Sequence, residues 1–314
     1  MSLLALQRGI VRFCERNTMS EYTKEDLINF EPHHTTLIGI DSDGCVFDTM
    51  EVKQKNHFHP LIIENWGLES VEIQLRQAAE FVNLYSAWRG QNRFPALLKT
   101  FELLEEWPEV IESGVQLPDI TALRTYCESG LSLGNPSLQL EVERTNDPEL
   151  KRILDWSLAV NRDIDENMES IPPFEWARRS IEKIKPTSDV IVVSQTPEEA
   201  LVKEWALHEM EQYVAVIAGQ ELGTKSEHLK MVASNRYEST KIIMIGDAPG
   251  DLRAAEAVGA WFYPINPGRE NESWERFHNE ACGKFIDGTF DATYQKKLSD
   301  EYKAALPSEP PWKQ

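Results

Sequence analysis

The stretch TLIGIDSDGCVFDTM, residues 36–50, joins an apolar run to a group of closely spaced acids. Residues 36–40 have the largely apolar character of a strand that is buried on both faces of a sheet. Asp41 and Asp43 follow directly, and Gly44 comes next. Two carboxylates at this spacing repel each other and contribute nothing to the stability of the strand. Their position therefore predicts a functional site where the strand ends.

The composition is ordinary for a soluble globular protein, but the charge is strongly negative. The chain has 314 residues, of which 41% are hydrophobic and 27% are charged, so it can bury a substantial core. The formal net charge is −20, and such a surface repels nucleic acid and anionic lipid. We therefore expect no nucleic-acid and no membrane partner. An anionic substrate has to be small and bound at a local positive site.

Neither the cysteines nor the first residues indicate secretion. The cysteines have no CxxC spacing, which predicts reduced thiols and argues against both a disulfide framework and a zinc site; they are Cys14, Cys45, Cys127 and Cys282. Arg8 and Arg12 interrupt the apolar start of the chain, so a signal peptide or membrane span is not convincing there. We expect a cytoplasmic protein in which residues 1–30 form an N-terminal extension. The sequence leaves the oligomeric state unknown.

The apolar pattern changes rhythm near residue 173. Residues 50–172 carry apolar residues at helical spacing, whereas the chain from 173 onward alternates helical segments with short apolar runs. Those runs are 189–194, 214–219, 241–247 and 260–265. Such alternation predicts an α/β domain with a parallel sheet, which the strand at 36–40 joins. We therefore predict a core domain of residues 31–49 and 173–314, interrupted by an all-helical cap domain of residues 50–172.

Smaller features of the helical segments lead to further expectations. Residues 272–306 predict two more helices that pack on the sheet, with residues 307–314 as a frayed end. His57 and His59 lie on different faces of a predicted helix, and we expect both on its surface.

The predicted strands end in polar side chains that suit phosphate chemistry. Ligands bind at the carboxyl ends of strands in an open parallel sheet. There the chain places Ser194, Lys225 after a glycine-containing loop, and Asp247 with Asp251 one helical turn later. Closely spaced carboxylates suit Mg²⁺, and Ser194 and Lys225 can donate hydrogen bonds to a phosphoryl group. A carboxylate held in line with phosphorus can form an acyl phosphate while a second acid transfers the proton.

This pattern resembles the haloacid dehalogenase-like superfamily of phosphohydrolases. The resemblance rests on DSDG at 41–44 with DT at 48–49, VVSQT at 192–196, Lys225, and GDAPGD at 246–251. It covers roughly residues 35–50 and 173–265. It implies a Rossmann-like parallel sheet core with a mobile helical cap inserted after the first motif, which is where the helical block independently falls.

The resemblance also implies a role for each motif residue. Asp41 would be the nucleophile and a metal ligand, and Asp43 the general acid and base, with its backbone carbonyl on Mg²⁺. Asp247 would bind the metal directly, and Asp251 would organise the metal's waters or Lys225. Ser194 and Lys225 would bind the phosphoryl group.

Several points qualify this assignment. Cys45 stands where such proteins often have threonine, and Gln195 where asparagine is common. Lys230 is an alternative to Lys225. Superfamily members that cleave carbon–halogen or carbon–phosphorus bonds typically lack an acid at the second position, so Asp43 favours phosphate esters.

In the predicted cap, a break between two helical segments carries Arg89 and Arg93 beside aromatic residues. We interpret these arginines either as contacts for a polar or anionic substrate or as part of a structural corner.

The sequence therefore predicts a Mg²⁺-dependent phosphohydrolase that acts on a small phosphorylated metabolite through an aspartyl-phosphate intermediate. A cap of about 120 residues favours an enclosed small substrate over a phosphoprotein. A phosphomutase with the same nucleophile is one alternative. A non-catalytic metabolite sensor or interaction protein on the same fold is another. The substrate's identity has no readable code in the cap.

Overall fold

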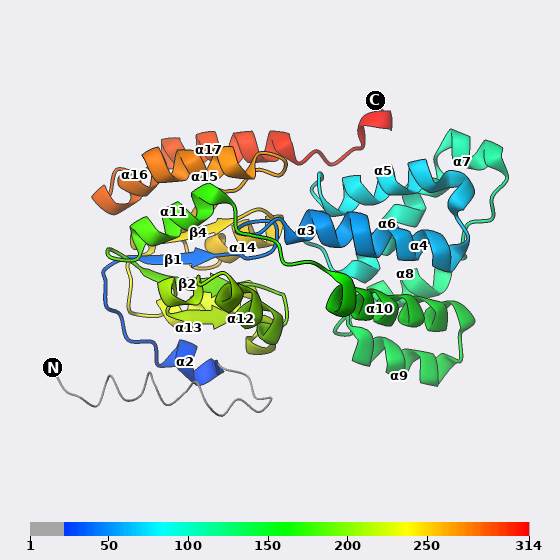
Figure 1. Ribbon diagram of the computed structural model, residues 1–314, viewed down its shortest axis with the longest axis horizontal. Coiled ribbons are helices and arrows are strands. Elements are labelled where there is room, and N and C mark those ends of the chain that lie inside the picture. The colour runs from blue at the N-terminus through cyan, green and yellow to red at the C-terminus, as the bar shows by residue number, and fades with distance from the viewer. Residues whose placement is uncertain (1–21, 314) are drawn as a thin grey trace.

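The computed structural model describes residues 22–313, and it consists of a parallel sheet with helices on both faces and a separate block of helices (Figure 1). The sequence-based expectations for Cys14 and for most of the N-terminal extension concern residues 1–21, which lie outside the described range. Among the described helices, none combines the length and the apolar character needed to cross a membrane.

The sheet has five parallel strands in the order β3-β2-β1-β4-β5. The strands are β1 (Leu37–Ile40), β2 (Asp189–Val193), β3 (Val216–Ala218), β4 (Ile242–Gly246) and β5 (Trp261–Pro264). β1 lies in the centre, with Leu37 opposite Asp189 on one side and Ile242 on the other. The strand order reverses at β1, and such a switch point is where open α/β sheets bind ligands. The predicted α/β class with a Rossmann-like parallel sheet is confirmed.

Both faces of the sheet are buried, which explains the nearly continuous apolar runs in the strands. In β1, Ile38 and Ile40 pack on one face and Leu37 on the other. The first face is covered by α11 (Glu175–Ile184), α12 (Glu198–Leu207), α15 (Glu270–Arg276) and α16 (Cys282–Asp287). The second is covered by α2 (Lys24–Ile28), α13 (Lys225–Ala233) and α14 (Pro249–Glu256), while α17 (Ala292–Ala305) packs along β5.

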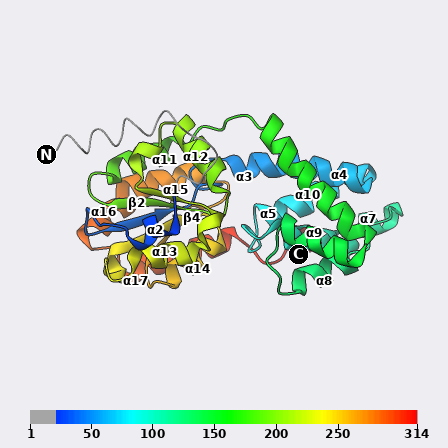
Figure 2. The same ribbon diagram turned by 90° about the horizontal axis from the view of Figure 1, so that it is seen from below.

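Between β1 and β2, residues 49–167 form an all-helical block with a core of its own. Figures 1 and 2 show this block beside the sheet and not on either of its faces. Its helices are α3 (Thr49–Val52), α4 (His59–Trp66), α5 (Glu72–Asn83), α6 (Arg93–Glu105), α7 (Pro108–Ser113), α8 (Thr121–Glu128), α9 (Asn135–Thr145) and α10 (Pro148–Asn167). Trp66, Phe101 and Trp156 meet at its centre. The inserted helical cap is confirmed, whereas the domain limits at residues 49/50 and 172/173 stay predictions.

His57 and His59 are buried, so the expectation that they lie on a helix surface is wrong. A π-helical turn, Lys53–Phe58, joins α3 to α4, and this segment is packed between α5 and α10. The Nδ1 atom of His57 lies 2.7 Å from Oδ2 of Asp163 on α10. Neither ring nitrogen of His59 has a hydrogen-bond partner within residues 22–313. Burial, with the nearby charges of Arg76 and Lys55, lowers the pKa of His59 from 6.5 to about 3.

We expect His59 to make the protein less stable in mild acid. The folded state keeps its imidazole neutral while the unfolded state takes up a proton below pH 6.5, so stability falls as the pH drops from 6.5 toward 3. Between pH 7 and pH 5 this single group removes about 2 kcal/mol from the free energy of unfolding. Urea unfolding at both pH values should show a correspondingly smaller loss for His59→Leu. The exposed His33, changed to leucine, is the control, and equal pH dependence of His59→Leu and wild type would contradict the prediction.

The C-terminal tail crosses from the core to the cap, so the expected frayed end is wrong for the described residues. The backbone amide of Ala87 donates to the Pro307 carbonyl at 3.2 Å. The Trp312 ring stacks on Trp107, with centroids 4.4 Å apart, and meets the edge of Phe81 at 5.5 Å. Lys313 adds an ion pair to Glu106. The tail therefore links α17 to the cap, as Figure 1 shows.

Replacing Trp312 with alanine should detach the tail from the cap. The loss of partly buried aromatic contact lowers the free energy of unfolding by about 2 kcal/mol. Hydrogen exchange of peptides covering residues 306–313 should become faster, while Trp312→Phe keeps a ring and should retain most of the protection. Unchanged exchange in Trp312→Ala would show that the aromatic contacts do not hold the tail.

Candidate active site

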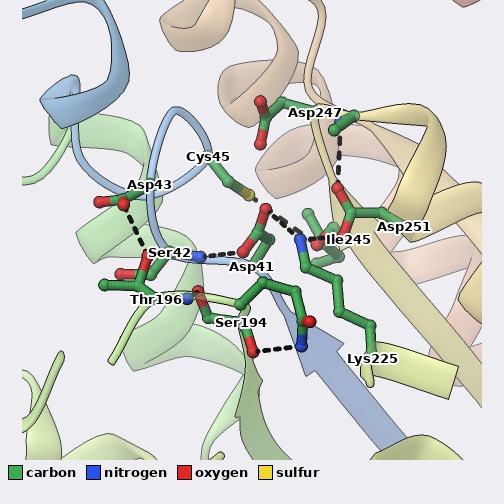
Figure 3. Close-up of polar contacts among 12 residues, drawn as sticks. Asp41, Ser42, Asp43, Cys45, Ser194, Thr196, Lys225, Ile245, Asp247 and Asp251 are labelled. Atoms are coloured by element: carbon green, nitrogen blue, oxygen red, sulfur yellow. Dashed lines mark hydrogen bonds and ion pairs between the residues drawn. The ribbon is translucent and has the colours of Figure 1, made fainter. Parts of the chain in front are cut away.

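Asp41 follows β1 at the centre of the sheet and is buried. Its backbone amide continues the ladder by donating to the Ile245 carbonyl at 3.0 Å, which fixes the position of the side chain. Its Oδ1 accepts a hydrogen bond of 2.8 Å from the backbone amide of Ser42. Figure 3 shows the carboxylate facing Lys225.

Lys225 connects two of the predicted acids. It is the first residue of α13, whose start is fixed by a capping box between Thr224 and Glu227. Its Nζ lies 2.7 Å from Oδ2 of Asp41 and 2.6 Å from Oδ1 of Asp251. Lys230, the alternative from the sequence, lines a shallow hollow with Ile242, at the amino end of β4. The structure therefore brings Lys225 to the acids.

Asp247 and Asp251 occupy the end of β4 and the first turn of α14. Oδ2 of Asp251 accepts a 3.0 Å hydrogen bond from the amide of Ala248. A Cβ at Gly246 would lie 2.3 Å from Cγ of Asp251, so only glycine leaves room for this side chain. Oδ1 of Asp247 is buried and has no hydrogen-bond partner among the described residues. Carboxylate oxygens of Asp41, Asp247 and Asp251 lie within 4.8 Å of one another.

The three clustered acids are in an unfavourable environment for negative charge. Burial raises the pKa of Asp41 to about 6, although Lys225 opposes the shift. Burial and the charge of Asp41 raise the pKa of Asp251 to about 6, and the pKa of Asp247 is also raised, mainly by burial. A cluster of hard oxygen donors with one orphaned buried oxygen fits a divalent cation such as Mg²⁺.

Asp43 lies apart from Asp247 and Asp251 (Figure 3). Its carboxylate accepts hydrogen bonds from Thr49 Oγ1 at 2.5 Å, Lys53 Nζ at 2.7 Å and Thr196 Oγ1 at 2.7 Å. Burial by itself would raise the pKa of Asp43, but the charge of Lys53 and these hydrogen bonds outweigh it and lower the pKa. In this arrangement Asp43 is therefore held as an anion.

The sequence analysis missed these three partners of Asp43. Thr49 and Thr196 lie within the quoted DT and VVSQT motifs, so their positions carried a signal. Lys53 carried none, because its approach depends on the π-helical turn that begins at this residue.

Ser194, Gln195 and Cys45 complete the site. Ser194 is buried at the end of β2, and its hydroxyl accepts a 3.2 Å hydrogen bond from the amide of Thr196. The side-chain amide of Gln195 donates to the Gly223 carbonyl at 2.9 Å, so it ties the β2 loop to the loop before Lys225. Cys45 is buried, and burial together with the charges of Asp247 and Asp41 raises the pKa of its thiol.

The two cap arginines have different surroundings. Nε of Arg89 lies 2.6 Å from Oδ2 of Asp247, and Nη1 donates to the Leu84 carbonyl at 2.8 Å. Arg93 instead donates to Ser157 and Asn161 within the cap, and its guanidinium lies 5.0 Å from the ring centroid of Phe58. The structure thus brings Arg89, but not Arg93, into contact with a predicted site residue.

No protein-family model and no curated protein matches the chain. Several solved structures do. A haloacid dehalogenase-like hydrolase from Streptococcus pneumoniae is 12% identical, covers 76% of this chain and 90% of its own, and has a TM-score of 0.41. A subfamily IA hydrolase of the same superfamily from Geobacter sulfurreducens is 14% identical, with coverages of 73% and 86% and a TM-score of 0.39.

A "predicted phosphatase" from Clostridium acetobutylicum is 13% identical, covers 80% of this chain and 99% of its own, and has a TM-score of 0.42. Because these TM-scores are below 0.5, we base the interpretation of the site on the geometry of this chain.

Substitution of Gly44 by alanine tests how closely the residues around Asp247 are packed. Its φ is +75°, and a Cβ there would lie 2.5 Å from Nη2 of Arg89 and 2.9 Å from Oδ2 of Asp247. Gly67 has a similar φ of +65° with no atom within 4 Å of the added Cβ. Gly67→Ala should therefore cost about 1 kcal/mol of stability from backbone strain alone, and Gly44→Ala about 1–3 kcal/mol more. Equal losses in thermal or urea unfolding would contradict the crowded arrangement.

Proposed function

We propose that the protein is a Mg²⁺-dependent phosphohydrolase that acts on a small phosphorylated metabolite through an aspartyl-phosphate intermediate. The observation that carries this proposal is the position of Lys225 between Asp41 and Asp251, beside the unpartnered buried oxygen of Asp247. Carboxylates and a buried cation meet at the carboxyl end of the sheet, and Ser194 follows the neighbouring strand β2. Attack by a carboxylate on a phosphate monoester uses these groups.

In the proposed reaction, a carboxylate oxygen of Asp41 forms a bond to phosphorus and the bond from phosphorus to the ester oxygen breaks. The leaving oxygen takes a proton from Asp43. A water molecule then loses a proton to Asp43 and attacks the phosphorus, which releases inorganic phosphate and restores the Asp41 carboxylate. Lys225 and Ser194 donate hydrogen bonds to the phosphoryl oxygens and stabilise their charge in the transition state.

The metal would be held by the carboxylates of Asp41 and Asp247 and by the backbone carbonyl of Asp43. When bound, Mg²⁺ supplies positive charge that offsets the negative charge of the carboxylates and the phosphoryl group. Asp251 is a positioning residue in this proposal, because its Oδ1 holds the Nζ of Lys225 at 2.6 Å. Oδ2 of Asp247 accepts the hydrogen bond from Arg89, whereas Oδ1 has no hydrogen-bond partner within residues 22–313.

Asp43 has to change its surroundings in order to act as an acid. Its three donors hold it as an anion, and two of them, Thr49 and Lys53, lie where the chain leaves the core for the cap. Movement of the cap would therefore change the hydrogen bonds that Asp43 receives. This supports a reaction in which cap movement and proton transfer are linked.

The residues of the cap favour a small substrate that carries a second polar or anionic group. Arg93 is partly buried, and this burial lowers its pKa to about 10. Within residues 22–313 its hydrogen-bond partners, Ser157 and Asn161, are uncharged, and no carboxylate forms an ion pair with it. We propose Arg93 as a contact for the part of the substrate distant from the phosphate.

Phosphate release from a panel of phosphorylated sugars, nucleotides and small acids tests the proposal. Turnover should require Mg²⁺ and stop with EDTA, and Asp41→Asn should lower kcat on the order of 10³-fold or more because it removes the nucleophile. Circular dichroism of Asp41→Asn controls for folding. Release of free phosphate without an added acceptor separates a hydrolase from a phosphomutase. Turnover that survives in Asp41→Asn would contradict the assigned nucleophile.

A further inference from the structure

The ion pair between Arg89 and Asp247 joins the cap to the core inside the proposed metal site. Arg89 lies in the loop of residues 84–92 between α5 and α6, and Asp247 follows β4. The two residues are 158 positions apart in the chain, and their side chains are 3% and 1% exposed. Little water screens the two charges of a buried pair of this kind. The loss of either partner therefore leaves the other charge buried and uncompensated.

Each nitrogen of the guanidinium has a defined place. Nε donates to Oδ2 of Asp247, and Nη1 donates to the Leu84 carbonyl of the same loop. Nη2 lies over the backbone of Gly44, only 2.5 Å from where a Cβ would be. The guanidinium therefore fills the space between Asp247, a proposed metal ligand, and Gly44, which follows the proposed ligand Asp43 in the chain.

From these contacts we propose that Arg89, a residue of the cap, competes with the divalent cation for Asp247. We call Arg89 a latch because its ion pair with Asp247 joins the cap to the core. This inference rests on the proposed function, since it uses the same metal site. A divalent cation and a guanidinium on one carboxylate repel each other at a separation of a few ångströms in a buried site. Metal binding therefore favours withdrawal of Arg89, and docking of Arg89 weakens metal binding by the same factor.

Other acidic side chains lie near Arg89 and can interact with its guanidinium when it leaves Asp247. Burial raises the pKa of Asp48 and of Glu270, and in both cases the nearby charge of Arg89 opposes the shift. Glu51 also feels this charge, after the effects of burial and of its hydrogen bonds to Lys55 and Tyr85. A withdrawn guanidinium thus has acidic neighbours close by, so it need not become fully exposed.

The base of the loop is fixed independently of Arg89. The amide of Ala87 donates to Pro307 of the C-terminal tail, and the amide of Arg89 itself donates to the Ser86 carbonyl at 2.9 Å. Tyr302 of α17 donates from its hydroxyl to the Asp247 carbonyl at 3.2 Å. The tail and α17 thus fix Ala87 and Asp247, and the part that can move is Arg89 together with the loop residues that follow it.

Metal affinity of wild type and Arg89→Met tests the proposal. Methionine keeps an unbranched apolar side chain and removes the charge, so Arg89→Met should bind Mn²⁺ at least ten-fold more tightly in calorimetric titration with MnCl₂. Arg76→Met is the matched control, because Arg76 also pairs through Nε with a carboxylate, Glu72, at 2.7 Å, but entirely within the cap. Its affinity for Mn²⁺ should stay within two-fold of wild type.

Hydrogen exchange of the wild-type protein is a second test of the latch, and it needs no variant. In wild type, MnCl₂ should speed the exchange of peptides covering residues 84–92, because the released loop loses its buried anchor. Equal dissociation constants for wild type and Arg89→Met, or slower exchange of this loop with Mn²⁺, overturn the latch and leave the proposed hydrolase intact. Absence of Mn²⁺ binding to wild type and to both variants overturns the metal-dependent function as well.

Discussion

The negative charge buried at the carboxyl end of the sheet is the constraint on which the rest of this site depends. Removing a carboxylate from water costs several kcal/mol, and three carboxylates within hydrogen-bonding distance of a common point add mutual repulsion. Cations have to offset this cost. Lys225 forms ion pairs with Asp41 and Asp251 from within the core, whereas Arg89 reaches Asp247 from the cap.

This division of the compensating charges explains why cap and core are connected through the site. Lys53, near the start of the cap, holds Asp43, and Arg89 holds Asp247. Each of these cations opposes the role that we propose for its acid. Lys53 keeps Asp43 anionic, although Asp43 has to donate a proton, and Arg89 occupies Asp247, a proposed metal ligand. A change in cap position therefore alters the charge at the site, and a change in charge alters the stability of the contacts between cap and core.

The C-terminal tail adds a contact that does not depend on charge at the site. Trp312 is packed against aromatic residues of the cap, far from the acids in the chain, and its contacts are mainly apolar. Apolar burial is insensitive to metal binding, so the tail can keep the cap near the core when the ionic contacts open. The cap is thus held by ionic contacts, which depend on the charge at the site, and by the apolar contacts of Trp312, which do not.

The sequence by itself determined the parallel sheet, the inserted helical block, and the meeting of Asp41, Lys225, Asp247 and Asp251. Local periodicity reveals buried strands, and parallel strands necessarily bring their carboxyl ends to one edge. Only the tertiary structure decided the partners of Arg89 and Lys53, the docking of Trp312 and the burial of His59. These depend on how distant segments, some of them 207 residues apart, pack together, and on a π-helical turn that shifts the register of one helix. Such contacts leave no pattern in the neighbouring sequence, because the residues that select them lie elsewhere in the chain.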